Sequence, residues 1–235
     1  LPIYMFSIIE ANPQLDYYID NTFNRLSYND SVYALCSYNS TYVTGSILVG
    51  GVFTSIGGNS HLNLVRVDKT GSIDNDFIGA NDGFSHNTFT SKVNAIVNDY
   101  SDLFQKEQIL VGGLFNTWVF DNGGKTNDIP CLVRIDNVGA LNKSFSDTSN
   151  INLSTDLSRS EVKAIATAEN VIVVGGNFDN AAGENIGFGI VKLDADGNIA
   201  SGWVHAPNDP NNYYGLNEAV YTVAIQSDGK IDRKS

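Results

Sequence analysis

The sequence predicts an all-β, propeller-like fold built from four-stranded antiparallel blades of about 60 residues. A segment with two adjacent glycines is written three times, as VGGVFTSIGG (49–58), VGGLFNTW (111–118) and VGGNFDNAAG (174–183), and successive glycine pairs lie 62 and 63 residues apart. Each copy stands in the same order between short apolar runs rich in Val, Ile and Leu. No window holds the 3.6-residue period of a helix, so helices should be few.

The first element of each repeat is a short apolar strand. It reads VYAL from 32, VNAI from 93, VKAI from 162 and VYTVAI from 220. These runs are rich in β-branched residues and are bounded by residues that favour turns, which is typical of strands. The sequence therefore predicts an opening strand at each of these four places.

The second element is an apolar run that ends in the glycine pair and an aromatic residue. A strand between two neighbouring blades is apolar on both faces, as ILVGG is. Glycines allow the backbone to bend or bulge where no side chain fits. We expect the ring two residues later to fill the gap against the adjacent blade. The residues concerned are Gly50, Gly51, Phe53, Gly112, Gly113, Phe115, Gly175, Gly176 and Phe178.

The third element is a strand, a turn and a short fourth strand that ends in a ring. It reads LVRVDKTGSIDNDF (64–77), LVRIDNVGALNKSF (132–145) and IVKLDADGNIASGW (190–203). KTG, NVG and ADG suit hairpin turns, because Gly can take positive φ and Asp or Asn tolerates the left-handed region. The aspartate and the ring are nine residues apart in every copy, and the pairs are Asp68 with Phe77, Asp136 with Phe145 and Asp194 with Trp203.

These blocks, together with AVYTVAIQSDGKI (219–231), resemble the delta-60 repeat family of β-propeller-like proteins over nearly the whole chain. Only the last copy keeps the family's Asp-Gly-Lys-Ile turn, at Asp228–Ile231. The resemblance implies a surface or secreted bacterial protein, or a structural protein of a tailed phage. It brings no catalytic residue set and no cofactor.

The repeats define one domain, 1–235, with incomplete units at both ends. Residues 1–31 form the tail of a repeat, because IDNTF (19–23) matches IDNDF (73–77). Three repeats follow at 32–92, 93–161 and 162–219, and 220–235 is the head of another. The ends either combine into a composite blade that closes a small four-blade ring, or belong to a partial ring cut from a longer array. No glycine-pair strand follows Ile231, which favours a partial ring cut from a longer array.

Composition and charge exclude several partners. The net charge is −12, and the basic residues are scattered, which argues against nucleic acid and anionic membranes. No apolar stretch is long enough to span a bilayer. The acidic, Asn- and Tyr-rich composition fits a virion or an extracellular location. Two cysteines at unrelated repeat positions do not form a disulfide scaffold.

No metal, cofactor or catalytic site is predicted. DADGNIASG (194–202) resembles a calcium loop, but His205 stands where an EF-hand needs Glu. The three histidines share no ligand spacing. Asp74 and Asp76 could serve a glycosidase, but the other copies carry Asn142 and Ala200 in place of Asp74.

The long loops at 79–91, 116–128 and 205–215 are the predicted binding surface, because loops on rigid scaffolds carry function. Trp118, Tyr213 and Tyr214 would stack on a sugar or a protein partner. The alternative is that these rings pack against their own blade.

The sequence favours a non-enzymatic structural or binding module in the tail or fibre of a tailed phage. Its expected partners are other virion or surface proteins in an oligomeric assembly, with a host glycan or receptor at the loops. A secreted or cell-surface bacterial adhesion or glycan-binding propeller is the alternative. A carbohydrate-active enzyme comes third.

Overall fold

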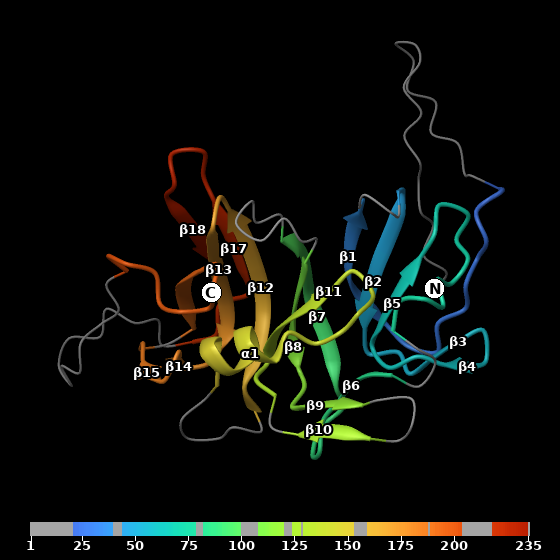
Figure 1. Ribbon diagram of the computed structural model, residues 1–235, viewed down its shortest axis with the longest axis horizontal. Coiled ribbons are helices and arrows are strands. Elements are labelled where there is room, and N and C mark those ends of the chain that lie inside the picture. The colour runs from blue at the N-terminus through green and yellow to red at the C-terminus, as the bar shows by residue number, and fades with distance from the viewer. Residues whose placement is uncertain are drawn as a thin grey trace, which may run out of the picture.

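The computed structural model describes residues 21–39, 44–78, 82–99, 108–119, 124–127, 129–152, 159–187, 189–203 and 218–234. These residues form small antiparallel sheets and one α-helix, α1 (Lys143–Ser149) (Figure 1). The all-β, propeller-like prediction is confirmed. None of the described helices is long and apolar enough to cross a membrane.

Three sheets share one plan, in which the glycine-pair strand lies between the opening strand and the third strand of its repeat. They are β1 (Val32–Tyr38), β2 (Ser46–Gly51) and β5 (Leu64–Val67); β7 (Lys92–Asp99), β8 (Gln108–Leu114) and β11 (Leu132–Asp136); and β12 (Glu161–Ala168), β13 (Val171–Asn177) and β16 (Ile190–Asp194). A fourth sheet has two described strands, β17 (Thr222–Ile225) and β18 (Ile231–Lys234).

The predicted fourth strand of each blade is reduced to a single bridge. The bridges pair Val67 with Ile73, Ile135 with Leu141, and Leu193 with Ile199. In the second repeat the chain then enters α1, because the Asn142 side chain accepts a hydrogen bond from the Phe145 backbone N–H at 3.2 Å. The blade is therefore a three-stranded sheet with a short closing turn.

The segments that follow the glycine pairs form three further small sheets. Two are hairpins, β3 (Ser55–Ile56) with β4 (Asn59–Ser60) and β14 (Asn180–Ala181) with β15 (Glu184–Asn185). The third joins two repeats, because β6 (Gly83–Ser85) of the first pairs with β9 (Thr117–Val119) of the second, which also pairs with β10 (Lys125–Asn127). All three lie along the same edge of the molecule, at the bottom of Figure 1.

The sheets follow one another in chain order. Strand β7 contacts β1 and β2 on one side and β12 on the other, and β12 contacts β17. The first sheet and the β17–β18 sheet lie at opposite ends of the molecule (Figure 1), so the described residues form an open, partial array. Residues 21–31 lie beside the first sheet, where the Asn24 N–H donates to the Thr70 carbonyl at 2.6 Å. Within the described part of the chain, residues 21–31 therefore form no sheet with β17 and β18.

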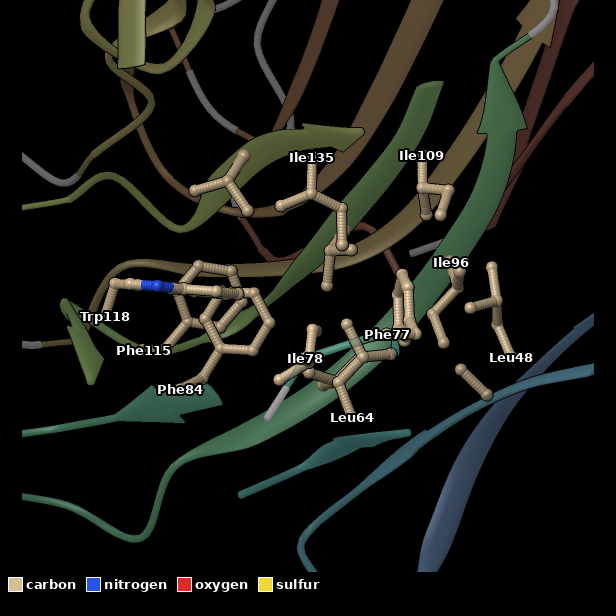
Figure 2. Close-up of a cluster of buried hydrophobic side chains, with 14 of the residues drawn as sticks. Leu48, Leu64, Phe77, Ile78, Phe84, Ile96, Ile109, Phe115, Trp118 and Ile135 are labelled. Atoms are coloured by element: carbon tan, nitrogen blue, oxygen red, sulfur yellow. The ribbon is translucent and has the colours of Figure 1, made fainter. Parts of the chain in front are cut away.

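The hydrophobic core lies in the seams between sheets. We call the contact between the β1–β2–β5 and β7–β8–β11 sheets the first seam, and that between the β7–β8–β11 and β12–β13–β16 sheets the second seam. Figure 2 shows the first seam, where Leu48, Leu64 and Phe77 face Ile96, Ile109 and Ile135. A second cluster fills the second seam, and a third covers the free side of the first sheet.

Candidate functional site at the seams between sheets

The first glycine of each pair lies against the opening strand of the next sheet. A Cβ on Gly50 would come within 2.5 Å of Val93 Cγ1 and 2.8 Å of Ile96 Cδ1. Gly112 faces Val162 and Ile165 in the same way, and Gly175 faces Val220 and Val223. This position therefore sets how closely two sheets approach.

The second glycine of each pair lies against a bulge in its own sheet. Gly51 faces the Ser31 carbonyl oxygen, and the register between β1 and β2 shifts between Val32 and Ala34. The other two pairs repeat this contact, with Gly113 at the Lys92 carbonyl and Gly176 at the Glu161 carbonyl. The bulge lies in the opening strand, and glycine is needed opposite it because no side chain fits against that backbone.

The repeated rings pack on both sides of these contacts. Phe115 and Phe178 lie in the first and second seams, and Phe53 packs on the free side of the first sheet, 5.0 Å from the Tyr28 ring. Phe77 follows the closing turn of the first repeat and Phe145 lies in α1, and each ring packs in the seam with the following sheet. Trp203 is partly buried and packs against the cluster of the second seam.

Two buried arginines, which were not predicted from the sequence, join neighbouring sheets. Arg66 and Arg134 occupy the same position in the third strand and are each 2% exposed. Each donates from Nη1 across the seam, to the Asn137 carbonyl at 2.6 Å and to the Ala195 carbonyl at 2.6 Å respectively. An arginine at the same place in two apolar LVR strands was the available indication.

The turns that receive these arginines are ordered by the repeated aspartates. Asp136 Oδ1 accepts from the N–H groups of Val138 and Ala140, at 3.0 and 2.8 Å. Asp194 accepts likewise from residues 196 and 198, and Asp68 from residues 70 and 72. The glycine three residues on takes positive φ in each turn. Asp136 and Asp194 therefore order the turns whose Asn137 and Ala195 carbonyls accept hydrogen bonds from the two arginines.

The two arginines differ in their carboxylate partners. Arg66 Nε donates to Asp74 Oδ2 at 2.9 Å, whereas Arg134 Nη2 donates to Asp99 Oδ2 at 2.6 Å. Asn142 replaces Asp74 in the second repeat and caps α1 instead. Burial lowers the pKa of Arg134, and Asp99 opposes that shift.

A carboxylate at the start of β12 joins the second and third sheets. Glu161 accepts from Lys92 Nζ at 2.6 Å, from Lys163 Nζ at 2.8 Å and from Asn94 Nδ2 at 2.9 Å. Asn94 also donates to the Val162 carbonyl at 2.8 Å. Burial alone would raise the pKa of Glu161, but the hydrogen bonds from Lys163, Lys92 and Asn94 outweigh it, so the pKa lies below its ordinary value.

This lowered pKa predicts an acid-sensitive contribution to stability. The carboxylate binds a proton less tightly in the folded than in the unfolded state, so its contribution is complete above the unfolded pKa of about 4.3 and is lost as the pH falls through the lower folded value. Glu161→Gln should cost about 1–2 kcal/mol of unfolding free energy at neutral pH. Its stability should then fall less than that of the wild type between about pH 5 and pH 3, measured by urea unfolding.

The exposed pair of Asp147 with Lys143 gives the control for this experiment. Asp147→Asn should reproduce the wild-type pH dependence, because exposed ion pairs contribute little. An unchanged acid limb in Glu161→Gln would contradict the assignment.

A cavity of about 300 Å³ lies at the outer side of the second seam. Arg134 and Phe145 are buried residues of its lining, and Ser144 of α1 and Asp196 and Asn198 of the turn after β16 are exposed ones. Its lining is mostly polar: Gln108, Arg134, Asn142, Ser144, Phe145, Thr148, Asp196 and Asn198. No ligand was predicted there from the sequence, because the lining residues come from two repeats.

The predicted loop residues do not gather at this cavity. Trp118 is 3% exposed and its ring packs edge-on against Phe84, with the centroids 4.9 Å apart (Figure 2). Trp118 belongs to the core of the first seam, so its ring cannot stack on a partner. The prediction of Trp118 as a binding residue is therefore wrong. Tyr213 and Tyr214 lie outside the described residues.

One comparison with known proteins, to a family model, agrees with the fold and names no activity. A sequence-family model described as "Domain of unknown function (DUF5122) beta-propeller" matches residues 44–77 and 170–199. The crystal structure of the computationally designed Ika4 protein is similar at 13% identity and a TM-score of 0.41, over 88% of this chain and 92% of that chain. No curated protein matches. The match to the family model, together with the repeated sheets, indicates a β-propeller-type domain.

Proposed function

We propose that this chain is a non-enzymatic structural and binding module of the tail or a fibre of a tailed phage. The observation that carries the structural role is the repeated seam: a glycine pair lies at each contact between sheets, and Arg66 and Arg134 add a hydrogen bond across the first and second seams. The buried charges described above have structural partners. Arg66 pairs with Asp74 and Arg134 pairs with Asp99. Glu161 pairs with Lys92 of the neighbouring sheet. The place in a phage rests on the resemblance to the delta-60 repeat family.

Localisation in purified particles tests the place. Antibodies against the chain should label the tail in electron micrographs of phage from the source culture, and the chain should sediment with particles in a density gradient. Recovery in the bacterial envelope fraction, and not in particles, would replace this placement by the bacterial-surface alternative.

A turnover assay tests the absence of enzymatic activity. The purified chain, incubated with bacterial capsule and cell-wall polysaccharides, should release no new reducing ends above a heat-denatured control. Release that disappears when one lining carboxylate, Asp196, is changed to Asn would contradict the proposal.

A further inference from the structure

The cavity at the second seam differs from the first seam at equivalent positions. The turn after Asp136, at the first seam, carries Val138 and Ala140 where the turn after Asp194, at the second seam, carries Asp196 and Asn198. All four residues are exposed, and Asp196 and Asn198 line the cavity. Since the two seams share their framework, the polar lining is not required for packing one sheet on the next.

The second difference concerns the buried arginine. Asp74 gives Arg66 Nε an acceptor at the first seam, but Asn142 uses its Oδ1 to bind the Phe145 N–H at 3.2 Å. Arg134 Nε therefore has no hydrogen-bond partner, although the residue is only 2% exposed and forms a wall of the cavity. A buried unpaired N–H costs about 1–3 kcal/mol, so an acceptor supplied from the cavity would be favourable.

The lining offers further groups without partners among the described residues. The Gln108 amide, the Ser144 hydroxyl and the Asp196 carboxylate line the cavity, and none of these side chains forms a hydrogen bond there. The set combines amide and guanidinium donors with amide, hydroxyl and carboxylate acceptors. A ligand that satisfies it must both donate and accept hydrogen bonds.

Charge restricts the ligand class. The positive charge of Arg134 is already paired with Asp99 at 2.6 Å, and Asp196 lies in its field at the cavity. An anion would meet the unpaired Asp196 carboxylate, and a cation would meet the guanidinium of Arg134. A volume of about 300 Å³ is at the lower end of ligand pockets, so the ligand is small.

We propose that this cavity binds one neutral, polyhydroxylated unit of a saccharide. A ligand hydroxyl oxygen at the inner end would give Arg134 Nε the acceptor that Asp74 gives Arg66, and an outer hydroxyl would donate to Asp196. The site adds a ligand to the structural role and stands whether the chain belongs to a virion or to a bacterial surface.

The test uses the whole chain and a panel of probes. These are the methyl glycosides of glucose, galactose, mannose and N-acetylglucosamine, with glucuronate and acetate as anionic probes. Saturation-transfer NMR and calorimetry should detect millimolar binding of at least one neutral glycoside and weaker binding of both anions. The double variant Asp196→Val with Asn198→Ala, which carries first-seam residues, should raise its Kd by about tenfold or more.

Two further variants keep the result interpretable. Asp147→Asn removes an exposed carboxylate of α1 that does not line the cavity, and it should leave Kd unchanged. If the double variant does not fold, the exposed Ser144→Ala variant is used, and its Kd should rise several-fold. The proposal is overturned if no neutral glycoside binds, if the variants bind as the wild type does, or if an anion binds more tightly.

Discussion

Replacing Gly51 by alanine should destabilise the protein by about 3 kcal/mol or more, whereas a matched change at Gly50 should be partly rescued by trimming its neighbour. The two glycines are adjacent, but they face different partners. The three atoms nearest to a Cβ on Gly50 belong to the side chains of Val93 and Ile96, whereas those nearest to a Cβ on Gly51 are backbone atoms of Ser31 and Val32. Side-chain atoms can be removed by mutation, and backbone atoms cannot.

The experiment is a double-mutant cycle measured by urea unfolding. Gly50→Ala with Val93→Ala should cost clearly less than the sum of the two single variants, because a Cβ at position 50 enters space that the Val93 methyl groups leave. Gly51→Ala with Val93→Ala should be additive. A Gly51→Ala variant that loses less than about 1 kcal/mol would show that the bulge moves freely, which the packing of the seam does not allow.

The glycine pair and the aspartate turn could be predicted because their cause is local. Two glycines after an apolar run indicate a place where no side chain fits, and an Asp followed three residues later by Gly favours a turn. Because the pattern recurs in three repeats, the same prediction applied at three places in the fold. The shortening of the fourth strand to one bridge could not be predicted, since so short a pairing leaves no periodicity in the sequence.

The remaining features depend on contacts between distant residues. Arg66 and its acceptor Asn137 are 71 residues apart, and neither residue alone indicates the other. Helix α1 has seven residues, too few for a helical period, and it forms where Asn142 replaces Asp74. Trp118 lies in a three-residue strand, and only pairing with β6 of the preceding repeat turns its ring toward Phe84.

Replacing Arg134 by methionine should cost about 3–5 kcal/mol of unfolding free energy, because it breaks a buried ion pair. The change leaves the Asp99 carboxylate, 10% exposed, without its cation, and it removes the donor to the Ala195 carbonyl across the second seam. It also removes a guanidinium that stacks 3.9 Å from the Phe145 ring centroid. Methionine keeps much of the aliphatic volume, so the loss measures mainly the polar contacts.

A mutation of Asp99 separates the contribution of the ion pair from that of the hydrogen bond to the Ala195 carbonyl across the seam. Asp99→Leu combined with Arg134→Met should recover much of the loss, since replacing both members of a buried pair by apolar residues is often close to neutral. What remains should reflect the Ala195 carbonyl, about 1–3 kcal/mol for a buried unsatisfied acceptor. Lys230→Met, at an exposed pair with Asp228, should change stability by less than about 0.5 kcal/mol. If the double variant loses as much as the sum of the single ones, Asp99 is not the group that Arg134 neutralises.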